Sequence, residues 1–157
     1  MTQPQEIPIT AEGLAQVRQE LDQLVSVRRP EIVAKIKAAR EHGDLSENFE
    51  YHAARNEQSF IETRILELDA IVKNHVIIES RGSNGRVDLL STVTFTEEGE
   101  PEERYRIVGS TEADPAAGKI SFESAIGRAL MGHRVGDEVE VQTPAGGRYT
   151  VRILKIE

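Results

Sequence analysis

Apolar residues in the first half of the chain recur at intervals of three and four positions, which is typical of one face of a coiled-coil helix. They are Leu14, Val17, Leu21 and Leu24, followed by Ile32, Ile36 and Ala39. This pattern predicts a helix that begins after an N-cap at Thr10 and continues to about Glu41. Pro30 has no backbone N–H to donate, so we expect a kink or short break within residues 26–30.

A second helix of similar length is predicted over residues 46–73. Its apolar seam consists of Phe60, Ile61, Ile65, Leu68 and Val72. Gly43 falls just beyond the first helix, where glycine is favoured, and should terminate it. Because only about two to four residues connect the helices, they should fold back as an antiparallel hairpin. Each helix would have about 28 residues and a length of roughly 42 Å.

After residue 75 the apolar residues alternate or form short runs, which indicates β-strands. The predicted strands are residues 76–78, 89–95, 105–108, 120–122, 139–141 and 149–156. Turns containing glycine or proline separate them, and one short helix is predicted over residues 124–131. The predicted fold class is therefore α+β. A long coiled-coil hairpin in residues 1–78 precedes a small antiparallel-sheet domain with one short helix in residues 79–157.

Composition narrows the possible functions. The chain has 157 residues, a net charge of −8, 4% aromatic residues and no cysteine. The negative charge argues against a generally basic nucleic-acid surface, so any such contact needs a local patch. Without cysteine there is no disulfide, thiolate metal site or cysteine nucleophile. The N-terminus does not resemble a signal peptide and no apolar run approaches membrane-spanning length, so we expect a cytoplasmic protein with no membrane partner.

The connection between the two helices carries the candidate chemistry. Asp44 and Glu47 have the spacing of a capping box, in which Asp44 would be the N-cap of the second helix and Glu47 would reach back from its first turn. Leu45, however, places an apolar side chain at the outermost point of a polar turn, which capping alone does not require. His42 and His52 could be combined with Asp44 into a zinc site, but no further ligands have matching spacing.

Two arginines flank this acidic connection. Arg40 and Arg55 each lie roughly two helical turns from it, so that an acidic apex is followed by basic residues. A solvated hairpin rarely needs such a pattern. A structural alternative is an ion pair with Glu41, Glu57 or another neighbour on the helix surface.

Residues 39–48 (AREHGDLSEN) closely resemble the bacterial transcript-cleavage (Gre) elongation factors, more strongly the GreA branch than GreB. The resemblance extends in order over nearly the whole chain. It includes residues 27–32, 50–55, 84–87, 105–109, 125–130 and 143–147. It implies that the hairpin enters the secondary channel of RNA polymerase, while an FKBP-like C-terminal domain docks outside the channel.

The resemblance also implies a mechanism. The family acts on backtracked complexes, in which the 3′ end of the nascent RNA has been extruded, and stimulates hydrolysis of that RNA by the polymerase. The chain itself would not be an enzyme. We expect Asp44 to be a direct ligand of a second Mg²⁺ shared with the polymerase, and Glu47 to ligate the ion or orient the attacking water. The free protein, expected to be a monomer, would hold no metal or cofactor.

Other tip residues take roles from the same resemblance. Arg40 and Arg55 match a small basic patch that contacts phosphates of the extruded RNA, and a small patch should favour very short released fragments. Leu45, Asn48 and Tyr51 would support the tip or face the active centre. Ordinary packing within the hairpin explains Tyr51 equally well.

The resemblance places docking against the polymerase rim helices at Glu123, Ser124 and Ala125. The family usually has proline where this chain has Ala125, which should leave the docking loop less pre-organised. Ser124 also suits the N-cap of the short helix. Two further departures lie near the tip, where Ser46 replaces a frequent lysine and Phe49 a frequent alanine.

Other functions remain possible. An inhibitory homologue that occupies the channel without promoting cleavage would share the architecture, although such relatives typically alter the Asp-Leu-x-Glu tip. A plain coiled-coil adaptor would not need acidic tip residues. An FKBP-like prolyl isomerase would need an aromatic-lined pocket. The second half offers only Phe95, Tyr105, Phe122 and Tyr149 for one and has no tryptophan, which argues against this alternative.

Overall fold

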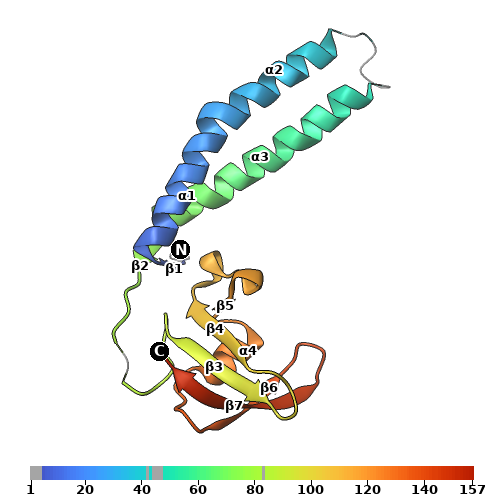
Figure 1. Ribbon diagram of the computed structural model, residues 1–157. Coiled ribbons are helices and arrows are strands. Elements are labelled where there is room, and N and C mark those ends of the chain that lie inside the picture. Colours follow the sequence, from blue (N-terminus) through green and yellow to red (C-terminus); the bar gives the residue numbers. More distant parts are fainter. Residues whose placement is uncertain (1–4, 42, 44–47, 83) are drawn as a thin grey trace. The chain divides into compact units, whose positions relative to one another are not determined.

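The computed structural model describes residues 5–41, 43, 48–82 and 84–157 (Figure 1). The chain forms two compact units. The first is built on Ala11–His75, and the second on Ile7–Thr10 together with Val76–Glu157. Residues 7–10 thus group with the C-terminal part of the chain, whereas the sequence placed everything up to residue 78 with the hairpin.

The first arm of the hairpin is one continuous helical segment with three parts. These are α1 (Ala11–Gln23), the π-helical turn η1 (Leu24–Arg28) and α2 (Arg29–Arg40). The predicted irregularity is therefore a π-turn and not a break. Pro30 cannot donate to the carbonyl four residues earlier, and the Arg29 N–H donates to the Leu24 carbonyl five residues back. The wider turn lets the helix continue past the proline.

The second arm is the single helix α3 (Phe49–Asn74), which runs beside α2 in Figure 1. A cluster of buried residues from both arms joins them. It contains Ile32, Ile36, Ala54, Ile61 and Ile65, with Leu21, Leu24 and Tyr51 packed against it. Half of the predicted seam residues belong to this cluster, but Phe60 does not, because it is 77% exposed.

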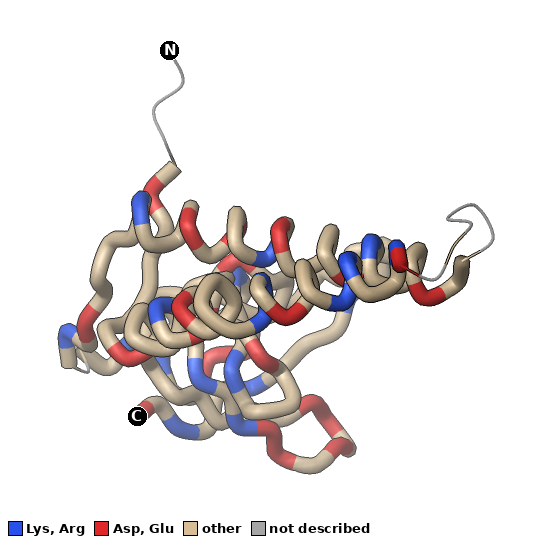
Figure 2. Tube along the Cα trace, turned by 90° about the horizontal axis from the view of Figure 1, so that it is seen from above, with Lys and Arg blue, Asp and Glu red and all other residues tan. Residues whose placement is uncertain are grey.

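Arginine–glutamate pairs also join the two arms. Arg29 donates to Glu62 over 2.8 and 2.9 Å, and Arg64 donates to Glu20 over 2.8 and 3.1 Å. These hydrogen bonds lower the pKa of Glu62 and of Glu20 below the usual value for glutamate. Exposed pairs add little stability. Opposite charges interspersed along the hairpin (Figure 2) nevertheless favour one register of the helices.

The second unit contains a five-stranded mixed sheet. Its strands, in the spatial order β5-β4-β3-β7-β6, are β3 (Thr92–Glu97), β4 (Glu103–Val108), β5 (Lys119–Ser121), β6 (Glu138–Gln142) and β7 (Arg148–Ile156). The prediction of a purely antiparallel sheet is wrong, because β4 and β5 are parallel. The segment between them forms the short 3₁₀ turns η2 (Ser110–Glu112) and η3 (Pro115–Ala117), and a parallel pair needs such a crossover.

The core of this unit follows the predicted alternation of apolar and polar residues along the strands. It comprises Val87, Val93, Phe95, Ile107, Ile120, Leu130, Val139, Val141, Val151 and Ile153. Leu130 comes from α4 (Ala125–Leu130), the predicted short helix, and is fully buried. Burial of this apolar set positions α4, and with it the predicted docking loop, against the sheet.

The sequence analysis did not predict the strand β1 (Ile7–Ile9), which pairs with β2 (His75–Ile77). Ile9 is fully buried, and its carbonyl accepts a hydrogen bond of 2.9 Å from the Ile78 N–H. A three-residue strand with a central proline has almost no local signal, because proline usually argues against a strand. Only pairing with a distant segment creates it.

Thr10, the residue after β1, forms hydrogen bonds with η2. The Thr10 N–H donates to Glu112 Oε2 over 2.9 Å, and the Thr10 hydroxyl donates to the other carboxylate oxygen. A Cβ on Gly109 would lie 2.5 Å from the Pro8 carbonyl oxygen. Glycine therefore permits a close approach of two backbones here.

Candidate functional site

The helix ends at the hairpin tip differ from the capping-box prediction. α2 ends at Arg40, and α3 begins at Phe49 with Asn48 as its N-cap. The prediction that Asp44 caps the second helix is therefore wrong, since the N-cap lies farther along the chain. The N-cap hydrogen bond of α3 comes from the Asn48 side chain.

Gly43 adopts a φ of +107°, which glycine tolerates and other residues avoid. It lies two residues beyond the C-cap Glu41 rather than directly after it. Asp44, Leu45 and Glu47 lie outside the described residues, as does His42 of the zinc alternative. Their assigned roles remain predictions.

Asn48 connects the two arms of the hairpin. Its Oδ1 accepts a hydrogen bond of 3.1 Å from the Tyr51 N–H, and its Nδ2 donates to the Ala39 carbonyl over 2.8 Å. The first bond satisfies a free N–H at the start of α3, and the second satisfies a carbonyl near the end of α2. One side chain thus holds the two helix ends that flank residues 44–47.

Tyr51 has both a packing role and a polar neighbour. Its half-buried ring packs against the hairpin core, and the Arg40 guanidinium lies 5.8 Å from the ring centroid. This distance is within the range of a cation–π contact, which restrains Arg40 without neutralising its charge. Tyr51 therefore both packs in the hairpin and restrains the Arg40 side chain.

Arg40 and Arg55 are exposed, and neither forms an ion pair with any residue that the structure describes. The predicted alternative, pairing with Glu41 or Glu57, is not observed. Glu57 instead binds Arg28 at 2.9 Å and Lys35 at 3.3 Å. Within the described ranges, both guanidinium groups are therefore available for an anionic ligand.

Substitutions of Asn48 should distinguish the contributions of its two hydrogen bonds to stability. Asn48→Ala removes both and should lower the free energy of unfolding of the hairpin by about 2 kcal/mol, whereas Asn48→Asp keeps the N-cap acceptor and should cost about 1 kcal/mol. Hydrogen exchange of the amides in the first turn of α3 measures both effects. Ser59→Ala, on the exposed surface of α3, is the control. An Asn48→Asp protein as protected as wild type would show that the Ala39 bond contributes nothing.

The predicted docking residues lie at the start of α4. Ser124 is its N-cap, as the structural alternative predicted, since its Oγ accepts a hydrogen bond of 3.1 Å from the Gly127 N–H. The same hydroxyl donates to the Ser121 carbonyl over 2.6 Å. Glu123 is exposed. The cap leaves the Glu123 carboxylate on the surface beside the helix start.

Ala125 is the first residue of α4, the position at which proline is most readily accepted. Ser124 has φ −67° and ψ 160°, the extended conformation that precedes proline. The proline that is usual in the family would therefore fit this backbone without rearrangement. The alanine removes a restraint on the loop but does not change its path.

The sequence analysis missed three residues that shape this loop. Ser110 and Ser121 form hydrogen bonds around Glu123. Gly127 allows α4 to approach the preceding loop, since a Cβ there would lie 2.1 Å from the Ser121 carbonyl oxygen. Ser110 had no detectable signal, because its contact with Glu123 depends on the β4–β5 crossover. Gly127, a helix-breaking residue within a predicted helix, was a usable signal.

An apolar cavity of about 380 Å³ lies next to the docking loop. Phe95, Tyr105 and Tyr149 line it together with Ser121 and Ser124. Burial raises the pKa of both tyrosines, and the nearby Glu103 carboxylate adds to the shift. Both phenols are therefore neutral at physiological pH. The structure brings together three of the four aromatic residues that the second half offers for an isomerase pocket.

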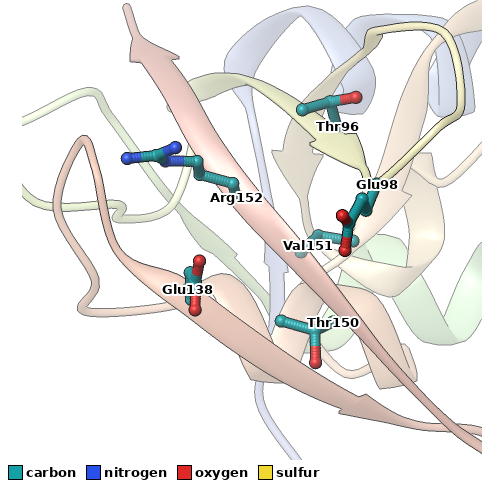
Figure 3. Close-up of a pocket in the computed structure, with 6 residues that line it drawn as sticks. All are labelled: Thr96, Glu98, Glu138, Thr150, Val151 and Arg152. Carbon is teal, nitrogen blue, oxygen red and sulfur yellow. The ribbon is translucent and has the colours of Figure 1, made fainter.

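A second hollow, of about 570 Å³, lies on the sheet surface (Figure 3). It is lined by Thr96, Glu98, Glu138, Thr150, Val151 and Arg152. The Arg152 guanidinium points away from Glu98 in Figure 3, and the charged groups do not converge on one point. We assign no binding role to this hollow.

Over the described part of the chain, no group of three or more His, Asp or Glu residues is placed to hold a metal ion. The predicted magnesium ligands are outside that part. Among the same residues, no helix is both long and apolar enough to cross a membrane.

Two family matches cover the chain in sequence. Residues 7–77 match the N-terminal domain of the GreA/GreB transcription elongation factors, and residues 82–157 match the GreA/GreB C-terminal domain. The proteins named transcription elongation factor GreA from Macrococcus caseolyticus and Bacillus licheniformis are 51% and 52% identical to this chain, each with 99% of both chains covered. The one from Staphylococcus epidermidis is 48% identical over the full length of both chains.

Among solved structures, the GreA factor homolog 1 protein of Thermus thermophilus is 30% identical, with 98% of this chain and 99% of that chain covered and a TM-score of 0.45. The two domain matches and the full-length sequence identities agree with each other. The chain belongs to the GreA/GreB family of transcription elongation factors.

Proposed function

We propose that this elongation factor acts on backtracked RNA polymerase by bringing Asp44 and Glu47 to the polymerase active centre through the secondary channel. The observation that carries the proposal is the hairpin itself. Two long helices are packed along their length, and Asn48 joins their ends on either side of residues 44–47. Such a rigid element suits the delivery of a short acidic segment into a narrow channel.

The chemistry of the acidic segment fits a shared Mg²⁺. Carboxylate oxygens are the ligands that Mg²⁺ prefers, and the ion often needs only one or two from protein. Asp44, with the polymerase carboxylates, would hold this second ion, so that one of the two ions could activate water while the other stabilises the leaving oxygen. Asp44 would be the more direct ligand, and Glu47 would orient the attacking water. The capping role of Asn48 is consistent with these tasks, since the N-cap position of α3 is not occupied by Asp44 or Glu47.

Arg40 and Arg55 would contact phosphates of the extruded RNA. Both are exposed and lack ion-pair partners among the described residues, and the Tyr51 ring restrains Arg40. A patch of two arginines reaches only a short stretch of backbone, so the released fragments should be short. The C-terminal unit, which we propose is FKBP-like, would dock through Glu123, Ser124 and Ala125 at the rim of the channel. The protein would act as a monomer in the cytoplasm and would not itself be a nuclease.

The test uses backtracked polymerase complexes with RNA labelled at its 5′ end. Wild-type protein should shorten this RNA in the presence of Mg²⁺, and should leave the same RNA intact when polymerase is omitted. Cleavage without polymerase would make the chain an enzyme and would contradict the proposal. Occupancy of the polymerase without shortened RNA would favour the inhibitory alternative.

Prolyl isomerisation is a second candidate because of one observation, the cavity lined by Phe95, Tyr105 and Tyr149. Its lining also includes the carboxylates of Glu97 and Glu103, which leaves the rim acidic. Acceleration of cis/trans exchange in a prolyl peptide by the wild-type protein, and its loss in Tyr105→Ala, would support this candidate. An unchanged exchange rate would remove it.

A further inference from the structure

The hydroxyls of Ser110 and Ser121 form a closed ring of hydrogen bonds with the N–H and the carboxylate of Glu123. Ser110 Oγ lies 2.7 Å from Glu123 Oε2 and 2.8 Å from Ser121 Oγ. The Glu123 N–H donates to Ser121 Oγ over 3.0 Å. The ring thus joins the start of η2, the end of β5 and the loop before α4.

Elementary hydrogen-bond accounting fixes the direction of every bond in the ring. An ionised carboxylate only accepts, so Ser110 must donate its single hydroxyl proton to Glu123. The bond between the two serines must then use the proton of Ser121. The Ser121 oxygen accepts from the Glu123 N–H, so each proton is used once. Because the Glu123 carboxylate is a charged acceptor, its hydrogen bond from Ser110 is stronger than one between neutral groups.

The turn that carries Ser110 is itself held in place. Glu112, in the same turn, accepts hydrogen bonds from the Thr10 N–H and hydroxyl. Gly109 lies so close to the Pro8 carbonyl that a Cβ would not fit. Ser110 is therefore presented from a backbone fixed on the residues of the β1 segment, and not from a free loop.

We propose that Ser110 is a positioning residue for polymerase docking, which holds the Glu123 carboxylate in its binding conformation. This inference rests on the proposed docking role of Glu123. The carboxylate is exposed and forms no ion pair with the described residues, and Oε2 is already engaged by Ser110. The free oxygen would accept a hydrogen bond from a lysine or arginine of the polymerase. Because Ser110 orders the side chain beforehand, binding does not pay the full entropy of immobilising it.

The experiment measures binding to polymerase and cleavage of backtracked RNA separately. Ser110→Ala should weaken binding by about three- to ten-fold and raise the protein concentration for half-maximal cleavage by the same factor. The rate at saturation should not change, because Ser110 does not touch the reacting groups. Ser110→Thr keeps a hydroxyl and should behave like wild type. Ser80→Ala removes an exposed serine elsewhere in the same unit and serves as the matched control.

A double-mutant cycle tests whether Ser110 acts through Glu123. Glu123→Gln should weaken binding, and adding Ser110→Ala to it should cause little further loss. Independent, additive losses would overturn the inference, as would wild-type binding by Ser110→Ala. Failure of this inference would appear in the measured affinity for polymerase. Failure of the proposed function would appear instead as unimpaired cleavage by a protein without Asp44. Circular dichroism confirms that each variant is folded.

Discussion

Replacing Asp44 with asparagine is expected to reduce cleavage of backtracked RNA by about 10²-fold, the usual effect of removing one pre-organised electrostatic group from a reaction centre. The change keeps the size of the side chain but removes a negative charge that favours Mg²⁺ binding. Since α3 is capped by Asn48, the substitution should leave the helix start intact. The loss should therefore appear in the cleavage rate at saturation and not in the affinity for polymerase. Rates with 5′-labelled RNA measure it.

Nearby carboxylates provide controls for this prediction. Glu50→Gln removes an exposed carboxylate from the first turn of α3, and should leave the cleavage rate within about two-fold of wild type. Glu47→Gln should be impaired, but less than Asp44→Asn if Glu47 acts on water. If Asp44→Asn cleaved as fast as wild type, the chain would not supply a metal ligand from that position. Greatly increased Mg²⁺ should partly rescue Asp44→Asn if the defect lies in ion affinity.

Gly127→Ala is expected to be the most damaging small substitution in the C-terminal unit. The added Cβ would lie 2.1 Å from the Ser121 carbonyl oxygen and 3.0 Å from the Phe122 Cα, both of them backbone atoms. Either α4 or the loop must move, and overpacking of this kind costs about 3 kcal/mol. Alanine's higher helix propensity, about 1 kcal/mol, offsets only part of this cost.

Hydrogen exchange of the β7 amides would measure the destabilisation in the intact protein. A loss of about 2 kcal/mol should speed globally limited exchange by roughly 30-fold. Arg128→Ala, at the next and exposed position of α4, is the control and should change stability by less than about 0.5 kcal/mol. Because Gly127 also donates to the Ser124 cap, its substitution should weaken polymerase binding as well. A Gly127→Ala protein as stable as wild type would mean that the close approach of α4 is not required.

Local rules predicted the helices and most strands successfully. The spacing of apolar residues placed both arms of the hairpin, and Pro30 predicted the position of the irregularity that became η1. The apolar residues at positions 139–141 correctly predicted a strand, and Val139 and Val141 are buried in β6. Each signal depends on neighbours a few positions away, which the sequence displays directly.

The start of α3 shows where local rules fail. Asp44 and Asn48 are both good N-cap residues, and the capping-box spacing favoured Asp44. Asn48 is the cap in the structure, and its amide also donates to the Ala39 carbonyl on the other arm. An aspartate lacks that donor. The contact across the hairpin thus favours Asn48 as the N-cap of α3, although the local pattern favoured Asp44.

The sheet shows the same limit over longer distances. The parallel pairing of β4 with β5 follows from a crossover through η2 and η3, which have little periodic signal. β1 exists only through its pairing with β2. The ring around Glu123 depends on this crossover, since Ser110 lies within it and Glu123 follows β5.

By itself, the sequence determined the two-part organisation, the helical hairpin, the family and the acidic residues between the helices, because periodicity and short motifs record local chemistry. The tertiary structure alone decided which residue caps α3, which arginines lack an ion pair among the described residues, and how Ser110 reaches Glu123. Those features depend on contacts between different elements of the fold. Their distances are set only when burial of the two cores brings the segments together.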